Sequence, residues 1–447
     1  MEALITRLGN ALRLPEDLRV PSHRELIDGL KHLEREFPAQ IRVSTDGRSK
    51  KGKELAFVEI GTGERVIAVT AGAHSDEPTG IATCFYLIKN LLQNQEFKFL
   101  TENYKFVFHP MLDPDGAELN YTWAAKEFSF YEYLKNYYRN NIPSEDCEHG
   151  IPVSSGQSIR PELEFFKRNI DRFKGCIDYY ITLHTTPHLG GSGFLLSAKS
   201  GVQETIDTLT KVCDYFGVPV MDVDTYGEDG LERIAPGFLT VPRMMKVAEK
   251  YRDNPEILSQ IKMPTYEYVD HFLGAPICMI SELPYIIDTK LQDMRESEVD
   301  LIDLKRRELE QSRKHILRTQ EAVAELKRLG VDEENPWFRS AEFAARFALD
   351  EVSGQEAQLE RYRGIKAKNY DLHDVQVSGL KAELNLHKLY IHSLKDRPEH
   401  RSIFDAHCRA FDEIYEQLES LIDYKVVPLT TQVRVQTAMI LSGVVGV

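Results

Sequence analysis

Three short segments carry side chains that can bind a metal ion or move a proton. The stretch AGAHSDEPTG holds His74 and Glu77 three residues apart, directly after the apolar run VIAVT. His184 follows a second apolar run, IDYYITL, and Glu282 follows a third, ICMIS. Two histidines and one glutamate form a zinc-binding set that leaves a fourth position open for catalysis. A carboxylate at the end of an apolar run is costly to bury unless it is paired or functional, so Glu282 is a candidate for chemistry as well.

Each of these residues also has an ordinary structural explanation. In a chain with 14 histidines, one His-x-x-Glu spacing can arise by chance, and a histidine at a strand end is usually a hydrogen-bonded structural residue. Glu282 can be a salt-bridged strand end, and His188 is a rival to His184 as a ligand. Their shared position at strand ends favours chemistry, because ligands bind at the carboxyl ends of strands in open α/β sheets.

The elements that must position these side chains follow from a change in composition along the chain. Before residue 290, apolar runs rich in β-branched residues alternate with turns and helical patterns. These runs predict an α/β fold with a mixed, mostly parallel sheet that helices cover on both faces. We therefore predict a catalytic domain at 1–290 and an all-α helical C-terminal region at 291–447. The expected strands are at 66–70, 105–108, 177–183, 193–196 and 277–281.

The segment after residue 290 has few glycines and prolines and is rich in Glu, Lys, Leu and Arg. Such a composition favours helices. Helical patterns run over 299–329 and about 340–350, 355–395 and 400–423, which predicts a helical bundle or a long helical hairpin. Its apolar stripes need burial, either within the chain or in a homo-oligomer. The tail from 426 onward is expected to dock on the body as a strand or a helix.

Charge and composition exclude several classes of function. The chain has 447 residues, with 55 Lys and Arg against 70 Asp and Glu, so its net charge is −15. An acidic chain without a basic cluster is not expected to bind nucleic acid. No apolar run of about 18 residues is present, so no transmembrane helix is expected. The N-terminus does not have the pattern of a signal peptide, and the six cysteines form no CxxC pair. These features predict a cytoplasmic protein without a membrane partner.

Five segments, taken in order, resemble the zinc metallocarboxypeptidase family in its carboxypeptidase A-like and murein-peptide amidase-like branch. GRSKKGKELAFVEIG (47–61) resembles the early hairpin of the family, and AGAHSDEPTG resembles its first metal motif. HPMLDPDGAELN (109–120) is similar to its Asn-Pro-Asp-Gly segment, with Asp113 in place of the usual Asn. YITLHTT and ISELPY resemble the strands that carry the second metal histidine and the catalytic glutamate. The resemblance covers about residues 21–290 and leaves the helical region unexplained.

The resemblance implies one Zn²⁺ per chain, held by His74, Glu77 and His184. It also implies that Glu282 is the general base. Zinc lowers the pKa of bound water to about 7 and polarises the scissile carbonyl, and the glutamate passes the proton of the water to the leaving amine. The expected fold is that of the zinc carboxypeptidases, and the expected partner is a peptide or a small amide substrate.

The groups that bind the substrate depart from the family pattern. The family clamps the terminal carboxylate of its substrate with an Asn-Arg pair, and no matching stretch is present. The candidates here are Arg139 with Asn140, Arg160, and Arg168 with Asn169. We favour Arg139 and Arg160, because each lies beside a proline-containing turn before the His184 strand. Tyr266 or Tyr268 is the candidate for the aromatic cap over the substrate, although both are equally suited to packing.

Three functions remain open at this stage. The first is a zinc-dependent carboxypeptidase or small-peptide amidase. The second is an N-acyl amino-acid deacylase, because the HSDE sequence of the metal loop is also close to that of aspartoacylase-like enzymes. The third is an inactive carboxypeptidase-like scaffold whose helical region is the working part.

Overall fold

The computed structural model describes residues 2–154, 156–198, 202–222, 231–241, 243–254, 258, 261–275 and 277–444. The strands are β1 (Ile41–Arg48), β2 (Glu54–Ile60), β3 (Arg65–Ala71), β4 (Tyr104–His109), β5 (Ile151–Pro152), β6 (Ile177–Leu189), β7 (Gly193–Ala198), β8 (Arg233–Ala235), β9 (Phe238–Thr240), β10 (Lys262–Met263), β11 (Ile277–Asp288), β12 (Glu296–Asp300), β13 (Lys366–Lys368) and β14 (Tyr424–Val426).

The helices of the body are α1 (Glu2–Ala11), α2 (His23–Glu36), α3 (Thr79–Gln93), α4 (Lys98–Asn103), α5 (Pro114–Ala124), α6 (Phe130–Asn136), α7 (Pro161–Ile170), α8 (Val202–Tyr215), α9 (Met244–Lys250) and α11 (Thr265–Tyr268). The later helices are α12 (Leu301–Arg328), α13 (Pro336–Glu356), α14 (Asn369–Leu394), α15 (Arg401–Leu421) and α16 (Leu429–Ser442).

One large mixed sheet organises the body, in the order β1-β2-β4-β3-β6-β11-β7-β9-β8, with β14 paired to β11. Its centre, β4-β3-β6-β11, is parallel, whereas β1 and β2 pair antiparallel with their neighbours. β7 pairs antiparallel with β11 and parallel with β9. All five strands expected from apolar runs are present. The predicted α/β class is therefore confirmed, with an antiparallel hairpin at one edge, as the motif at 47–61 predicts.

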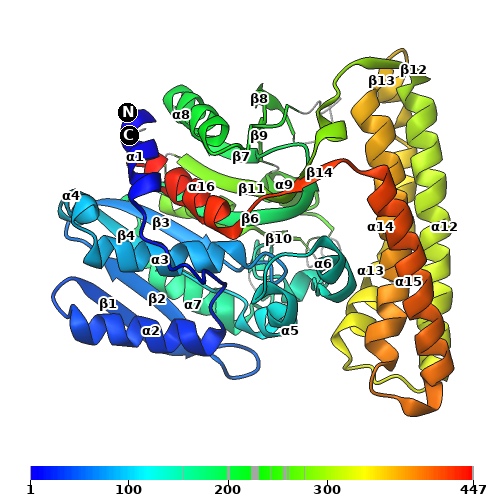
Figure 1. The fold of residues 1–447 in the computed structure, drawn as a ribbon, viewed down its shortest axis with the longest axis horizontal. Coiled ribbons are helices and arrows are strands. Elements are labelled where there is room, and N and C mark those ends of the chain that lie inside the picture. Colours follow the sequence, from blue (N-terminus) through cyan, green and yellow to red (C-terminus); the bar gives the residue numbers. More distant parts are fainter. Residues whose placement is uncertain are drawn as a thin grey trace.

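The sheet is buried on both faces, which explains its nearly continuous apolar strands. Successive residues of β3 alternate between two cores: Ile67 and Val69 pack in the core under α1, α2, α3, α8 and α16, whereas Val66 and Ala68 pack in the core under α7 and α11. This alternation follows from the period of two along a strand. Helices therefore cover both faces of the sheet (Figure 1).

The helical region stands beside the body as an upright group of four long helices, α12 to α15, at the right of Figure 1. A third core joins this group to the body, where Tyr285 and Ile286 of β11 meet Leu384 of α14 and Phe411 of α15. The chain then returns to the body as α16, whose Val433, Met439 and Leu441 lie in the core of the α1 face. The expected docking of the tail is confirmed, as a helix. The division at residue 290 stays a prediction.

One expected helix is wrong in its extent. The pattern over 355–395 predicted a helix, but α13 ends at Glu356 and α14 begins only at Asn369. Between them lies the short strand β13, which pairs with β12. Gly364 has a φ of +78°, a conformation that glycine adopts readily and that a helix does not tolerate. The helix over 340–350 is longer than expected and begins after Asn335, whose side chain caps its first turn.

Two of the strands that carry candidate site residues are longer than expected. β6 and β11 do not end near His184 and Glu282 but continue to Leu189 and Asp288. β3, in contrast, ends at Ala71, which lies opposite Leu183. His184 is therefore the first residue of β6 beyond the end of β3. On the β3 side, the edge of the sheet still falls at this residue. Among the described residues, no helix is long and apolar enough to cross a membrane.

Candidate metal centre

The loop between β3 and α3 carries His74 and Glu77 out of the sheet edge. It turns at Gly72, whose φ of +61° favours glycine. Backbone N–H groups of Leu112 and Asp113 donate to the carbonyl oxygens of Ala71 and Gly72, at 2.9 and 2.8 Å. The loop is therefore fixed against the segment at 109–120, which the sequence singled out. The side chain of Asp113 in turn accepts from Gly116 N and caps α5.

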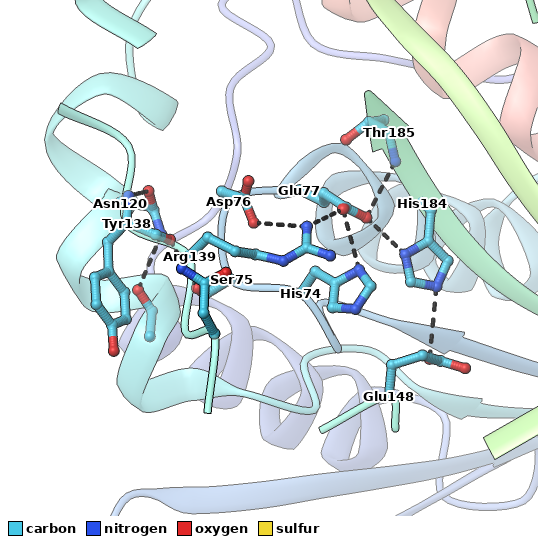
Figure 2. Close-up of polar contacts among 12 residues, drawn as sticks. His74, Ser75, Asp76, Glu77, Asn120, Tyr138, Arg139, Glu148, His184 and Thr185 are labelled. Atoms are coloured by element: carbon cyan, nitrogen blue, oxygen red, sulfur yellow. Dashed lines mark hydrogen bonds and ion pairs between the residues drawn. The ribbon is translucent and has the colours of Figure 1, made fainter. Parts of the chain in front are cut away.

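The three residues predicted as metal ligands lie together in the structure. His74 Nδ1 is 3.1 Å from Glu77 Oε1, and His184 Nδ1 is 2.6 Å from Glu77 Oε2. One ligand atom from each residue lies within 4.8 Å of the others, and all three side chains are nearly buried. Figure 2 shows the carboxylate of Glu77 in contact with both imidazole rings. Two imidazole nitrogens and one carboxylate suit Zn²⁺, so the residues present fit the metal that the resemblance implies.

The charges of this cluster support one another. Burial alone raises the pKa of a carboxyl group, but the imidazoles of His74 and His184 hold the pKa of Glu77 well below its usual range. Arg139 contributes in the same direction. Glu77 therefore stays ionised, which is the form that binds a cation.

Two further carboxylates face the outer nitrogens of the histidines. His184 Nε2 lies 3.5 Å from Glu148 Oε2, and His74 Nε2, which has no hydrogen-bond partner, lies 3.8 Å from Asp146 Oδ2. Metal-ligating histidines commonly turn their second nitrogen to a carboxylate, which fixes the ring and its tautomer. Both Nδ1 atoms are thereby directed at the same point. This arrangement independently fits a metal centre.

Glu148 is buried and firmly held. Thr265 Oγ1 donates to its Oε1 at 2.6 Å, and Thr182 Oγ1 donates to its Oε2 at 3.1 Å. Burial disfavours its charge, yet the hydrogen bond and charge of His184 lower the pKa of Glu148 to about 2. Sequence reasoning missed both Glu148 and Asp146. The only signal is their place in the acidic stretch SEDCEHG, whose spacing gives no indication of a metal.

Glu282 lies directly opposite His184 in the parallel register of β11 and β6. Paired residues on adjacent strands point to the same side of a sheet, so the carboxylate shares the face of the metal cluster. Removal of water from its carboxyl group and the nearby charge of Glu77 raise the pKa of Glu282 to about 7. A carboxyl group with such a pKa can both accept and release a proton near neutral pH.

Arg139 is the predicted substrate residue that lies closest to the cluster. Its Nη1 donates to Glu77 Oε1 at 2.6 Å and to Asp76 Oδ1 at 3.2 Å. About a third of the side chain is exposed, so the guanidinium connects the buried cluster to the surface. Figure 2 shows it lying alongside Asp76 and Glu77.

The other three predicted substrate residues have different surroundings. Arg160 is nearly buried and forms a two-pronged ion pair with Glu162, at 2.8 and 2.9 Å. Asn140 donates to Glu145 Oε2 at 3.2 Å and lines the same small cavity as His74 and Arg139. Tyr266 is only 3% exposed and belongs to the core under α7, where burial raises the pKa of its hydroxyl. Their roles toward a substrate stay predictions.

His188, the rival ligand, is not part of this cluster. It lies four residues further along β6, about 13 Å away at roughly 3.3 Å per residue. There His188 Nε2 lies 2.9 Å from Asp288 Oδ2, and His373 Nε2 lies 2.6 Å from the same oxygen. Asp288 Oδ1 accepts from the backbone N–H groups of Lys290 and Asp423.

This second cluster, His188–Asp288–His373, joins the ends of β6 and β11 to α14. Lys381 Nζ lies 3.1 Å from His188 Nδ1, so every polar atom of His188 and Asp288 has a partner. A buried network in which the polar groups are satisfied stabilises a fold without a metal. The cluster therefore acts as a clamp between the body and the helical region.

Comparison with known proteins gives a consistent result. Residues 26–152 match the family model described as zinc carboxypeptidase. A zinc carboxypeptidase of Simulium vittatum is 29% identical over 102 residues, which are 22% of this chain and 34% of the relative. An inactive metallocarboxypeptidase, ECM14, of Ajellomyces capsulatus is 23% identical over 139 residues, which are 29% of this chain and 21% of the relative. The matches thus span about a third or less of these relatives.

Among solved structures, carboxypeptidase A from Helicoverpa armigera superposes with a TM-score of 0.40 at 16% identity, over 64% of this chain and 70% of that one. The segment matched by the family model contains Glu148, the hairpin at 47–61 and the first metal motif with His74 and Glu77. His184 and Glu282 lie outside the matched segment. The resemblance to zinc carboxypeptidases that the sequence predicts is therefore confirmed, and residues 26–152 carry the match to that family.

Proposed function

We propose that this protein is a zinc-dependent hydrolase of peptide or amide bonds, specifically a carboxypeptidase or a small-peptide amidase. The observation that carries the proposal is the meeting of His74, Glu77 and His184 at one edge of the sheet, with Glu282 directly opposite His184. The family match of residues 26–152 supports the choice of zinc and of the reaction.

In this proposal His74 and His184, through Nδ1, and Glu77, through its carboxylate, hold one Zn²⁺ per chain. The bound ion supplies a Lewis acid that activates water and polarises the scissile carbonyl. Glu148 and Asp146 keep the two imidazole rings oriented, because each carboxylate faces an Nε2 atom.

Glu282 then acts as the general base. Its carboxylate accepts a proton from the attacking water and passes that proton to the leaving nitrogen, which departs as an amine. Arg139 lies beside the cluster and brings the positive charge that stabilises the negative oxygen formed from the carbonyl. Both side chains work from fixed positions, Glu282 on β11 and Arg139 through its ion pairs.

Two alternatives each have one observation in their favour. The HSDE sequence of the metal loop, which is close to that of aspartoacylase-like enzymes, favours an N-acyl amino-acid deacylase. A relative described as an inactive metallocarboxypeptidase favours a non-catalytic binding protein. A panel of C-terminally free peptides and small acyl amino acids separates the first alternative from the main proposal.

The deciding experiment measures zinc content and hydrolysis in the same preparations. We expect about one zinc per chain in the wild type and in Glu282→Gln, with hydrolysis lost only in the variant. His184→Ala is expected to lose the metal. His188→Ala is the matched control, because it removes another buried histidine of β6 that lies in the clamp instead, and it should keep the zinc.

Other outcomes contradict the proposal in distinct ways. Full activity in Glu282→Gln rules out the proposed base, and a wild-type chain without zinc rules out the metal site. Zinc that binds normally without any hydrolysis across the panel favours the inactive scaffold.

A cytoplasmic location is part of the proposal. It is supported by the six cysteines, all of which are free thiols in the structure. Disulfides are rare in reducing compartments, so free cysteines are typical of a cytoplasmic protein. Fractionation of cells that express the full chain tests this point.

A further inference from the structure

A cavity of about 530 Å³ lies between the body and the helical region, next to the metal cluster. Its walls come from α6 and the segment after it on one side, and from α12, α13 and α14 on the other. Arg139 and Asp76 line the cavity, and Arg139 also contacts Glu77. A volume of this size suits a small-molecule site or the end of a peptide.

The cavity contains a buried lysine that forms no ion pair with the described residues. Lys388, on α14, is only 7% exposed and lines the cavity. Among the described residues it has no carboxylate within ion-pair distance, and its Nζ lies over the ring of Tyr137, 3.0 Å from the centroid. An isolated buried ammonium group is costly, and burial accordingly lowers the pKa of Lys388 well below its ordinary value.

The acid whose charge acts on Lys388 is already engaged. Among the described residues that line the cavity, Asp76 is the only acidic one. Its Oδ1 accepts from Arg139 at 3.2 Å, and its Oδ2 accepts from the hydroxyl of Tyr133 at 3.4 Å. The amine of Lys388 is therefore free to pair with a ligand, and a ligand carboxylate next to it would favour its charged form.

The remaining surface of the cavity is aromatic and offers one more unsatisfied polar group. Tyr133, Tyr137, Tyr138 and Trp337 form much of its wall. The Nδ1 atom of His315, on α12, is buried without a hydrogen-bond partner among the described residues. The amine of Lys388 beside flat, largely apolar walls suits an organic anion with an apolar stem.

We propose that this cavity binds a carboxylate group of the substrate and that Lys388 is the residue that recognises it. This inference rests on the proposed hydrolase function and deepens it. The helical region then has a defined task, because it supplies the specificity residue and half of the pocket. The carboxylate belongs either to an acidic side chain or to the chain terminus of the substrate, and the two sources are separable with small probes.

Direct binding to the zinc-loaded full chain tests the proposal with three probes of nearly equal size. N-acetyl-glutamate α-amide carries only a side-chain carboxylate, N-acetyl-glutamine carries only a terminal carboxylate, and N-acetyl-glutamine amide carries none. Calorimetry should detect binding of at least one monocarboxylate at an affinity at least tenfold above that of the neutral diamide. The monocarboxylate that binds identifies the source.

Lys388→Met should weaken that binding at least tenfold, and Lys388→Arg should retain most of it. Removal of an unpaired buried charge is neutral or stabilising, so Lys388→Met should melt no lower than the wild type without a ligand. Lys381→Met is the matched control, because Lys381 lies on the same helix but contacts His188 outside the cavity. Its probe binding should be that of the wild type.

The failures are distinguishable. Equal binding in the wild type and Lys388→Met, or no preference for a carboxylate over the diamide, overturns this inference while zinc-dependent hydrolysis stands. A chain that hydrolyses nothing but binds a monocarboxylate through Lys388 overturns the proposed function and upholds the carboxylate site.

Discussion

Arg139 Nη1 lies 2.6 Å from Glu77 Oε1, so a guanidinium group directly contacts a carboxylate of the metal cluster. The same atom contacts Asp76, 3.2 Å away. Arg139 is thus fixed at the boundary between the buried cluster and the cavity shared with the helical region. A positive charge at this position opposes binding of a dication but stabilises an anion that forms beside it.

Replacement of Arg139 should therefore separate catalysis from metal binding. In Arg139→Met we expect kcat/KM to fall roughly 10²–10³-fold, as for the loss of one group that stabilises an oxyanion. The zinc affinity, measured by competition with a chelator, should stay the same or increase because a nearby positive charge is removed. Arg139→Lys should recover part of the activity. Loss of zinc in Arg139→Met would show instead that the residue mainly orders Glu77.

Glu148 should control the affinity for zinc through His184. Its carboxylate faces His184 Nε2 at 3.5 Å, and loss of such a partner commonly weakens metal binding about 10–100-fold. We expect Glu148→Gln to show this loss in chelator competition. Asp146→Asn is the comparison variant, because Asp146 lies further from its histidine, 3.8 Å from His74 Nε2, and should have the smaller effect. An equal or reversed order contradicts the ranking by distance.

The sequence predicted the fold where one local pattern decided the structure. Apolar runs predicted five strands of the large sheet, and all five are present. The motifs indicated the residues that meet as His74, Glu77 and His184. The ends of β6 and β11 were not predictable, because β6 extends by pairing with β11 and the end of β11 pairs with β14, and these partners are distant in sequence. Long-range pairing of this kind leaves no periodic signal.

The parts of the site that escaped prediction share one property. Glu148, Asp146 and Lys388 are charged residues, and charged side chains are exposed in most folded proteins. Their burial depends on the histidines and helices that pack over them in three dimensions. Arg160 is the opposite case, because it was predicted to bind a substrate. Its bidentate ion pair with Glu162 is apparent only in the folded chain, where α7 has formed.

The clamp at Asp288 should hold the helical region on the body. Its Oδ2 faces both His188 and His373, and Asp288 is fully buried. We expect Asp288→Asn to lower the free energy of unfolding by roughly 3 kcal/mol, because it weakens two charge-assisted hydrogen bonds in a buried site. Hydrogen exchange should increase first in α14, near His373. Unchanged protection of α14 would show that the third core alone, at Tyr285 and Phe411, holds the two parts together.

His109 should make the protein sensitive to mild acid. It ends β4 and is 2% exposed, with its ring centroid 4.8 Å from those of Phe57 and Phe166. Its Nε2 has no hydrogen-bond partner in the part of the chain that the structure describes, and burial lowers the pKa of the imidazole from 6.5 to about 3. The unfolded chain therefore takes up a proton below pH 6.5 that the folded chain takes up only near pH 3. Stability from this group is complete above pH 6.5 and decreases as the pH falls through that window.

His109→Phe should remove that dependence while it fills the aromatic site. At pH 7.5 we expect the free energy of unfolding to stay within about 1 kcal/mol of the wild type, as for a change that keeps core volume. Between pH 6.5 and pH 4 the wild type should lose roughly 3 kcal/mol more than the variant. Urea unfolding at pH 6.5 and at pH 4 measures this difference in the free energy of unfolding. Loss of any bound metal in acid affects both proteins alike. Parallel pH profiles would show that His109 is hydrated in the folded chain, since only contact with water keeps its pKa near the ordinary value.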